Sequence, residues 1–82
     1  MEREVTIKLN ETMEATPIAH LVQLANQFDS KVYLEADEKR VNAKSIMGMM
    51  SLVLSSGAKV SIIAEGDDED RAIDAMESFL TA

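Results

Sequence analysis

A serine at the predicted start of a short apolar helix is the residue of this sequence best placed to take part in chemistry. Ser45 stands directly before Ile46-Met47-Gly48-Met49-Met50, where a hydroxyl can accept hydrogen bonds from the free backbone N–H groups of a first helical turn. A phosphate on that hydroxyl would meet the positive end of the helix dipole. Ser45 is therefore a candidate phosphorylation site as well as a candidate helix cap.

The helix that follows this serine is apolar on nearly every side. A projection at about 100° per residue places one set of side chains on one side, Met49, Leu52 and Val53, and another set on the other, Ile46, Met47, Met50 and Leu54. All of them could be core, but a sheet can receive only one face of a helix, which favours exposure of Ile46, Met47 and Met50. Because methionine adapts to partners of different shapes, these three residues are candidates for a docking surface.

Two other polar features invite a metal-site interpretation that the sequence does not favour. His20 is the only histidine and there is no cysteine, so a zinc site lacks ligands. His20 also lies off the apolar stripe of its predicted helix, which indicates a surface position. The run Asp67-Asp68-Glu69-Asp70 lacks the glycine and the distal glutamate of a calcium loop, and it suits the first turn of a helix. We expect no metal and no cofactor.

Length, composition and charge limit the class of protein. The 82 residues are 46% hydrophobic, with a formal net charge of −7, which predicts a single domain over residues 1–82 with a small packed core. The acidic charge argues against direct binding of nucleic acid. No apolar run reaches the roughly 18 residues that would span a bilayer, and Met1-Glu2-Arg3-Glu4 lacks the layout of a signal peptide. We therefore expect a cytoplasmic protein that does not enter a membrane.

The hydrophobic period changes along the chain and predicts seven elements that would position these residues. Apolar and polar residues alternate over 5–9, and Val32 and Leu34 share one face over 31–35, which predicts two strands. Asp37-Glu38 is expected to connect the second strand to a short third strand over 40–43. Residues 59–64 are strongly β-branched and predict a fourth strand. Helical spacing predicts a helix from Pro17 to Phe28, the short helix after Ser45, and a last helix that opens in 66–70. The expected core residues of the two longer helices are Ile18, Leu21, Val22, Ala25, Phe28, Ala72, Ile73, Met76, Phe79 and Leu80. The order β-α-β-β-α-β-α predicts a two-layer α+β sandwich.

The order of these elements resembles that of the HPr family. The same resemblance is seen in the segment Val41-Asn42-Ala43-Lys44-Ser45-Ile46-Met47-Gly48 and in the following Met50-Ser51-Leu52. HPr proteins are the small phosphocarriers of the bacterial sugar phosphotransferase system. The resemblance covers essentially the whole chain. It implies an open-faced β-sandwich, in which a four-stranded antiparallel sheet is covered on one face by three helices.

A second motif of the family is altered in this sequence. HPr proteins carry His-Ala-Arg-Pro before the first helix, and the histidine takes phosphate from enzyme I; the matching residues here are Glu14-Ala15-Thr16-Pro17. A neutral imidazole can accept and release a phosphoryl group, whereas Glu14 would have to form an acyl phosphate against its own charge. Ordinary phosphocarrier activity is therefore not expected. Glu14 could be a passive replacement, a partner of the helix dipole, or a fixed imitation of a phosphorylated histidine.

An HPr protein without the histidine but with the regulatory serine is similar to the Crh branch of the family. In that branch HPr kinase/phosphorylase phosphorylates the serine, and the product is a corepressor of the transcription factor CcpA in carbon catabolite repression. The resemblance implies a protein that is not an enzyme, with Ser45 as its switch. It also implies partner-binding residues at Glu14, Thr16, Ile46, Met47 and Met50.

Two alternatives to this interpretation remain open. Thr16 stands where the Crh branch usually carries an arginine that contacts CcpA, so the chain could instead be an HPr-like module that binds a metabolic enzyme. It could also be a component of the phosphotransferase system that carries phosphate on Glu14 or His20.

Overall fold

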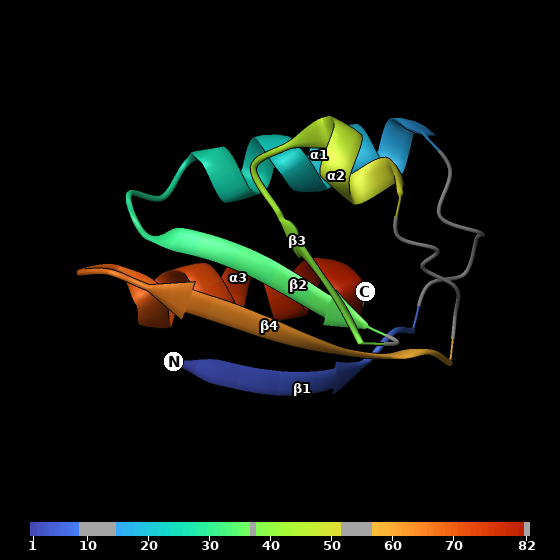
Figure 1. Cartoon of the computed structure of the whole chain (residues 1–82). Helices are drawn as coiled ribbons and strands as arrows, with labels where there is room; N and C mark the ends of the chain where they lie inside the picture. Colours follow the sequence, from blue (N-terminus) through green and yellow to red (C-terminus); the bar gives the residue numbers. More distant parts are fainter. Residues whose placement is uncertain (9–14, 37, 52–56, 82) are drawn as a thin grey trace.

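The computed structural model describes residues 1–8, 15–36, 38–51 and 57–81, except for the side chains of residues 15–17. Within these ranges seven elements follow one another (Figure 1): β1 (Glu2–Thr6), α1 (Ala15–Asn26), β2 (Lys31–Ala36), β3 (Lys39–Asn42), α2 (Ile46–Met50), β4 (Lys59–Glu65) and α3 (Glu69–Leu80). The order β-α-β-β-α-β-α predicted from the sequence is confirmed.

The four strands form one antiparallel sheet in the order β1-β4-β2-β3. The last strand in the sequence, β4, therefore lies between β1 and β2 and pairs with both. Its central position agrees with its β-branched sequence, since Val60, Ile62 and Ile63 are all buried. The sheet expected from the family resemblance is confirmed.

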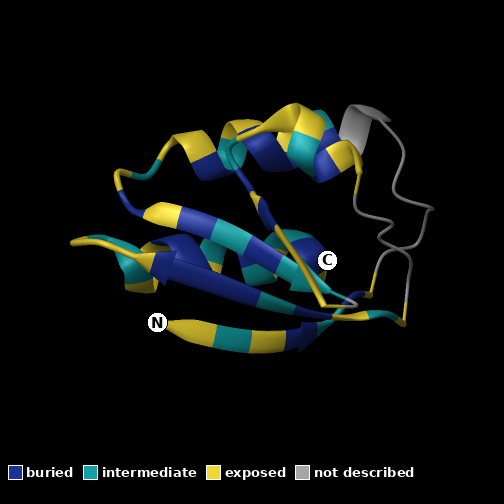
Figure 2. Ribbon diagram, in the orientation of Figure 1, coloured by how far each residue is buried: buried dark blue, intermediate teal, exposed yellow. Residues whose placement is uncertain are grey.

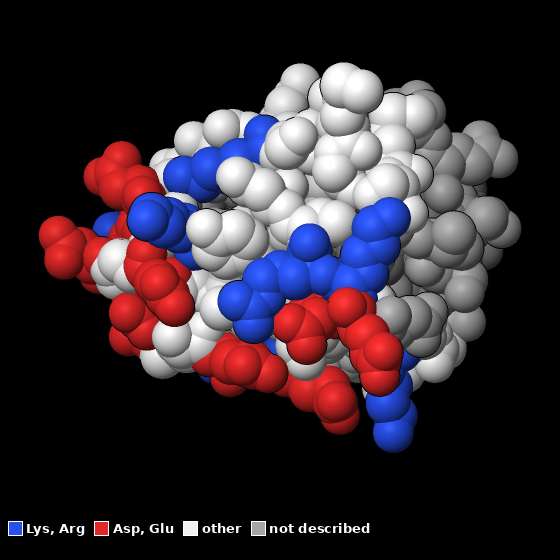
Figure 3. All heavy atoms as spheres, viewed as in Figure 1, with Lys and Arg blue, Asp and Glu red and all other residues white. Residues whose placement is uncertain are grey.

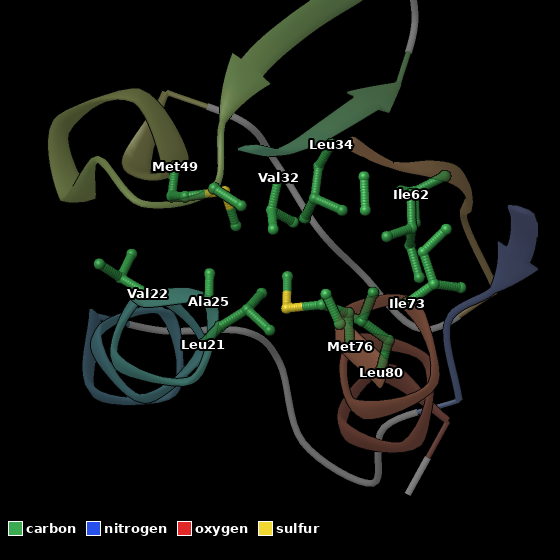
Figure 4. Close-up of a cluster of buried hydrophobic side chains, with 14 of the residues drawn as sticks. Leu21, Val22, Ala25, Val32, Leu34, Met49, Ile62, Ile73, Met76 and Leu80 are labelled. Carbon is green, nitrogen blue, oxygen red and sulfur yellow. The ribbon is translucent and has the colours of Figure 1, made fainter. Parts of the chain in front are cut away.

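The helices lie on one side of this sheet, and the core fills the space between the two layers (Figures 1 and 4). Leu34 and Ile62 pair across β2 and β4, and both side chains are fully buried against the helices. The predicted core positions of the two long helices are buried, except that Phe28 and Phe79 pack half-buried at the margin of the core. Figure 2 shows the resulting separation of buried and exposed surfaces.

The first strand begins three residues earlier than its hydrophobic pattern predicts. The sequence predicts a strand from Val5 to Leu9, whereas β1 spans Glu2–Thr6. Arg3 occupies an inner position, because it pairs with the buried Ile62, and its Nη1 reaches Asp74 at 2.7 Å and Glu77 at 2.8 Å on α3. A charged side chain at an inner position removes the alternation that marks a strand, so the prediction of this boundary was wrong.

The start of α3 is fastened to the turn between α1 and β2. The Asp68 carboxylate accepts hydrogen bonds from the backbone N–H groups of Asp29 and Ser30, each at 2.9 Å, and from the Ser30 hydroxyl. A Cβ atom at Gly66 would lie 2.6 Å from Ser30 Oγ and 2.7 Å from Ser30 Cα. The acidic run 67–70 therefore does more than complement the helix dipole. Its residue Asp68 links the turn before α3 to the turn before β2.

Candidate functional site

Ser45 is the N-cap residue of α2, as the sequence predicts. Its backbone is extended, with φ −107° and ψ 116°, and its Oγ accepts a hydrogen bond from Gly48 N at 3.3 Å. The Ser45 carbonyl accepts from Met49 N at 2.9 Å and so begins the helical pattern. The side chain is exposed, so the hydroxyl caps the helix and remains open to solvent.

Three hydrogen bonds fix the backbone immediately before Ser45. Asn42 Oδ1 accepts from Lys44 N at 2.8 Å, and the Asn42 carbonyl accepts from Ser45 N at 3.0 Å. Asn26 Nδ2, at the end of α1, donates to the Lys44 carbonyl at 3.3 Å. The backbone that leads into Ser45 is therefore held by both β3 and α1.

The support that Asn26 and Asn42 give to the serine was not predicted from the sequence. A signal existed for Asn42, because an asparagine just before a helix often bonds the backbone two residues further along. No local signal existed for Asn26, which lies 18 positions from Lys44 in the chain.

A single buried methionine anchors α2 to the body of the protein. Met49 is 0% exposed, and Figure 4 shows its side chain near Val22 and Ala25 of α1. The C-terminal end of the helix is closed by Ser51, whose Oγ donates to the Gly48 carbonyl at 2.6 Å. The helix is therefore held firmly on one side, although it has only five residues.

The opposite side of α2 is an apolar surface that faces solvent. Ile46, Met47 and Met50 are 43%, 82% and 56% exposed. We call these three side chains the docking surface. The exposure predicted for them from the helical projection is confirmed, as is the burial of Met49. Leu52, Val53 and Leu54, which the same projection assigned to the two sides, lie outside the described residues.

The charge around the docking surface differs from that of the rest of the visible face. In Figure 3 the region where Figure 1 places α2 is largely uncharged. Acidic side chains gather below it and to its left, toward β1, the C-terminal end of β4 and the hairpin of β2 and β3. Lys44 precedes the serine, and its Nζ donates to the Phe28 carbonyl at 2.7 Å. Lys39 Nζ donates to the Ser51 carbonyl at 3.3 Å. A partner would therefore meet an apolar surface bordered by lysines on a molecule that is acidic overall.

Comparisons with known proteins agree with this architecture. The family model described as "PTS HPr component phosphorylation site" matches residues 1–82. The chain belongs to the HPr family. It is 46% identical over 80 residues to the HPr-like protein Crh of Halalkalibacterium halodurans, covering 98% of this chain and 95% of that protein. It is 45% identical over 80 residues to the HPr-like protein Crh of Bacillus subtilis, covering 98% and 94%.

A solved structure of the same family confirms the fold. The crystal structure of a phosphocarrier protein HPr from Bacillus anthracis matches with a TM-score of 0.92 and 39% identity, over 98% of this chain and 95% of that chain. Similarity in sequence to Crh proteins and in structure to HPr therefore applies to nearly the whole chain.

The residues that stand in place of the HPr histidine motif are placed less fully by the structure. Glu14 lies outside the described residues, and Thr16 belongs to α1 with its side chain outside them. His20 lies on α1 with its side chain exposed, as its spacing predicts. The proposed roles of Glu14 and Thr16 therefore stay predictions.

Metal and membrane interpretations gain no support from the described part of the chain. No three His, Cys, Asp or Glu side chains within residues 1–8, 15–36, 38–51 and 57–81 are arranged to hold a metal ion. Within the same ranges, no helix has both the length and the apolar character needed to cross a bilayer.

Proposed function

We propose that this HPr-family chain is a regulatory protein of carbon catabolite repression and not an enzyme. HPr kinase/phosphorylase would phosphorylate Ser45, and the phosphorylated protein would bind a CcpA-type transcription regulator as its corepressor. The regulator would contact DNA, and this acidic chain would act on transcription only through it. The similarity to two Crh proteins over 98% of the chain supports this choice within the family.

One observation carries the proposal: an exposed hydroxyl adjoins an exposed apolar surface on the same short helix. Ser45 is exposed to solvent, and the docking surface begins at the next residue, with Met47 82% exposed. Exposed apolar patches on small proteins commonly mark contacts with other proteins. A partner that covers the docking surface would therefore also contact any group attached to Ser45.

Phosphorylation at this position would alter the surface more than the fold. It would add roughly −1.5 to −2 charges at the start of a helix, where the dipole favours negative charge. Gly48 N already donates toward Ser45 Oγ, so a phosphate oxygen has a donor close by. The remaining oxygens would be free to accept charge-assisted hydrogen bonds from a basic group of the partner, which are stronger than neutral ones.

The test has two steps and a matched control on the same helix. HPr kinase and ATP are expected to label the unaltered protein and Ser51→Ala, but not Ser45→Ala. Ser51 is a suitable control because it is also exposed and lies at the other end of α2. Binding to CcpA, measured by titration calorimetry, is expected to increase only for the labelled forms. Persistent labelling of Ser45→Ala would contradict the assignment of the switch.

The second candidate function is that of a phosphocarrier. The structural similarity to a phosphocarrier protein HPr supports it. Incubation with enzyme I and phosphoenolpyruvate separates the two functions. Acid-labile label on His20, or hydroxylamine-sensitive label on Glu14, would favour a carrier. The regulatory proposal expects neither, because His20 lies six positions beyond the motif position held by Glu14, whose own charge opposes transfer.

A further inference from the structure

The five methionines that the structure describes occupy two different environments, and the sixth, Met13, lies outside the described residues. Met49 and Met76 are fully buried, whereas Met1, Met47 and Met50 are 47%, 82% and 56% exposed. A thioether is open to oxidation to the sulfoxide, and the sequence contains no cysteine thiol that would compete for an oxidant. The fold therefore decides which of these sulfur atoms an oxidant can reach.

We propose that Met47 is a modification site, oxidised by peroxide, with Met50 as a slower second position. The product would convert the docking surface from apolar to polar. The modification itself does not depend on the proposed function, whereas its effect on the binding of a transcription regulator rests on it.

The reaction needs only a hydroperoxide such as hydrogen peroxide. A lone pair of the Met47 sulfur attacks one peroxide oxygen, so that an S–O bond forms and the O–O bond breaks. For hydrogen peroxide the other oxygen leaves as hydroxide with the electron pair of that bond. It takes up the proton that the transferred oxygen loses, so the products are the sulfoxide and water. The sulfur is oxidised by two electrons, the peroxide is reduced by two, and no further reactant is required.

The arrangement of α2 makes this oxidation selective and compatible with the native fold. Met47 is the most exposed of the large hydrophobic residues in the described part of the chain. Met49, two positions along, points into the core beside α1 (Figure 4) and is 0% exposed. The methionine that anchors the helix is thus protected, while its exposed neighbours can react.

A sulfoxide would disturb the docking surface because its oxygen is a polar acceptor. A partner that covers Met47 would have to bury this oxygen, and an unpaired buried acceptor costs enough free energy to weaken binding about 5- to 100-fold. Methionine sulfoxide reductases can reverse the change. Oxidation would therefore act as a second, reversible control beside the serine.

The first experiment maps the oxidation in the complete folded chain. The protein is treated with increasing hydrogen peroxide, and peptide mass spectrometry follows the gain of one oxygen atom at each methionine. We expect Met47 to react first and Met50 next, with Met49 and Met76 last; in strong urea all four should react at similar rates. Reaction of Met49 or Met76 as fast as Met47 in the folded protein would overturn the proposal.

The second experiment tests the consequence with Met47→Leu/Met50→Leu, because leucine keeps the apolar contact and cannot take up oxygen. Peroxide should shorten the retention of the unaltered folded protein on a hydrophobic-interaction column, and not that of the variant. It should also weaken binding of the Ser45-phosphorylated protein to CcpA about 5- to 100-fold, again not for the variant.

Failure of the proposed function is distinguishable from failure of this inference. If the untreated phosphorylated protein does not bind CcpA, the proposed function fails, and the chromatographic shift still decides whether oxidation makes the surface polar. Unchanged retention of protein oxidised at Met47, or an equal shift in the double variant, would overturn the inference.

Discussion

The Ser45 hydroxyl combines a structural contact with chemical accessibility. It accepts a hydrogen bond from Gly48 N at 3.3 Å, and the side chain remains exposed. The bond is long for N–H···O, so the cap is not the main support of α2. Loss of this hydroxyl is therefore expected to leave α2 in place.

We expect Ser45→Ala to lower the free energy of unfolding by about 0.5–1 kcal/mol, because the Gly48 N–H loses its acceptor. Ser45→Asp restores an acceptor at the cap and is expected to recover most of that loss. Urea unfolding followed by circular dichroism measures both. A Ser45→Ala protein as stable as the unaltered one would show that the hydroxyl contributes nothing as a cap. In either case the alanine variant should stay folded, so a loss of labelling could be assigned to the missing hydroxyl.

At the scale of elements, α2 is a helix too short to be stable by itself, and it is held by its packing. Isolated helices of fewer than about 12 residues are marginal in water, and α2 has five. Met49 supplies the apolar contact, whereas Asn26 and Asn42 fix the backbone that enters the helix. The buried contact that holds α2 and its exposed apolar side chains therefore lie on opposite sides of the helix.

Two methionines of this helix should respond very differently to the same substitution. Met49→Ala removes a fully buried side chain and is expected to lower the free energy of unfolding by about 2–5 kcal/mol. Met47→Ala removes an exposed one and should change it by no more than about 0.5 kcal/mol. Urea unfolding of both variants provides the comparison. Similar losses in the two proteins would mean that the docking surface is part of the core.

How much of this arrangement could be predicted from the sequence depends on the range of the contacts. The cap at Ser45 and the exposure of Met47 follow from local spacing, and the sequence predicted both. The start of β1 could not be predicted from local spacing, because Arg3 is charged yet faces the helices. Its partners Asp74 and Glu77 lie more than 70 positions away in the chain. The spacing of hydrophobic residues within one segment gives no information about an ion pair with a distant segment.

At the scale of the whole molecule, the acidic charge is unevenly placed. The formal net charge is −7, yet the uncharged docking surface is bordered by Lys39 and Lys44, with acidic groups collected elsewhere on the visible face (Figure 3). A phosphate on Ser45 would place new negative charge where the surface has little. Phosphorylation would therefore change the electrostatic potential strongly at the docking surface, even though the protein as a whole is already acidic.

Contacts between distant turns give the molecule a predictable dependence on pH. Hydrogen bonds from Ser30 Oγ, and from the backbone N–H groups of Asp29 and Ser30, lower the pKa of Asp68 from 3.8 to about 2. The folded state therefore binds this proton less tightly than the unfolded chain does. The ionised carboxylate stabilises the fold fully above pH ~4, and its contribution fades as the pH falls toward about 2.

Asp68→Asn isolates this contribution, and Asp67→Asn at its exposed neighbour is the matched control. Urea unfolding between pH ~2 and ~6 should show Asp68→Asn to be less stable than the unaltered protein above pH ~4, with the difference shrinking toward pH ~2 as the wild-type carboxylate takes up its proton. Asp67→Asn should keep the wild-type profile through this window. A difference that stays constant over the whole range would show that the lost stability comes from the shape of the side chain and not from its charge. In that case, the hydrogen bonds that join α3 to the turn before β2 would not depend on ionisation.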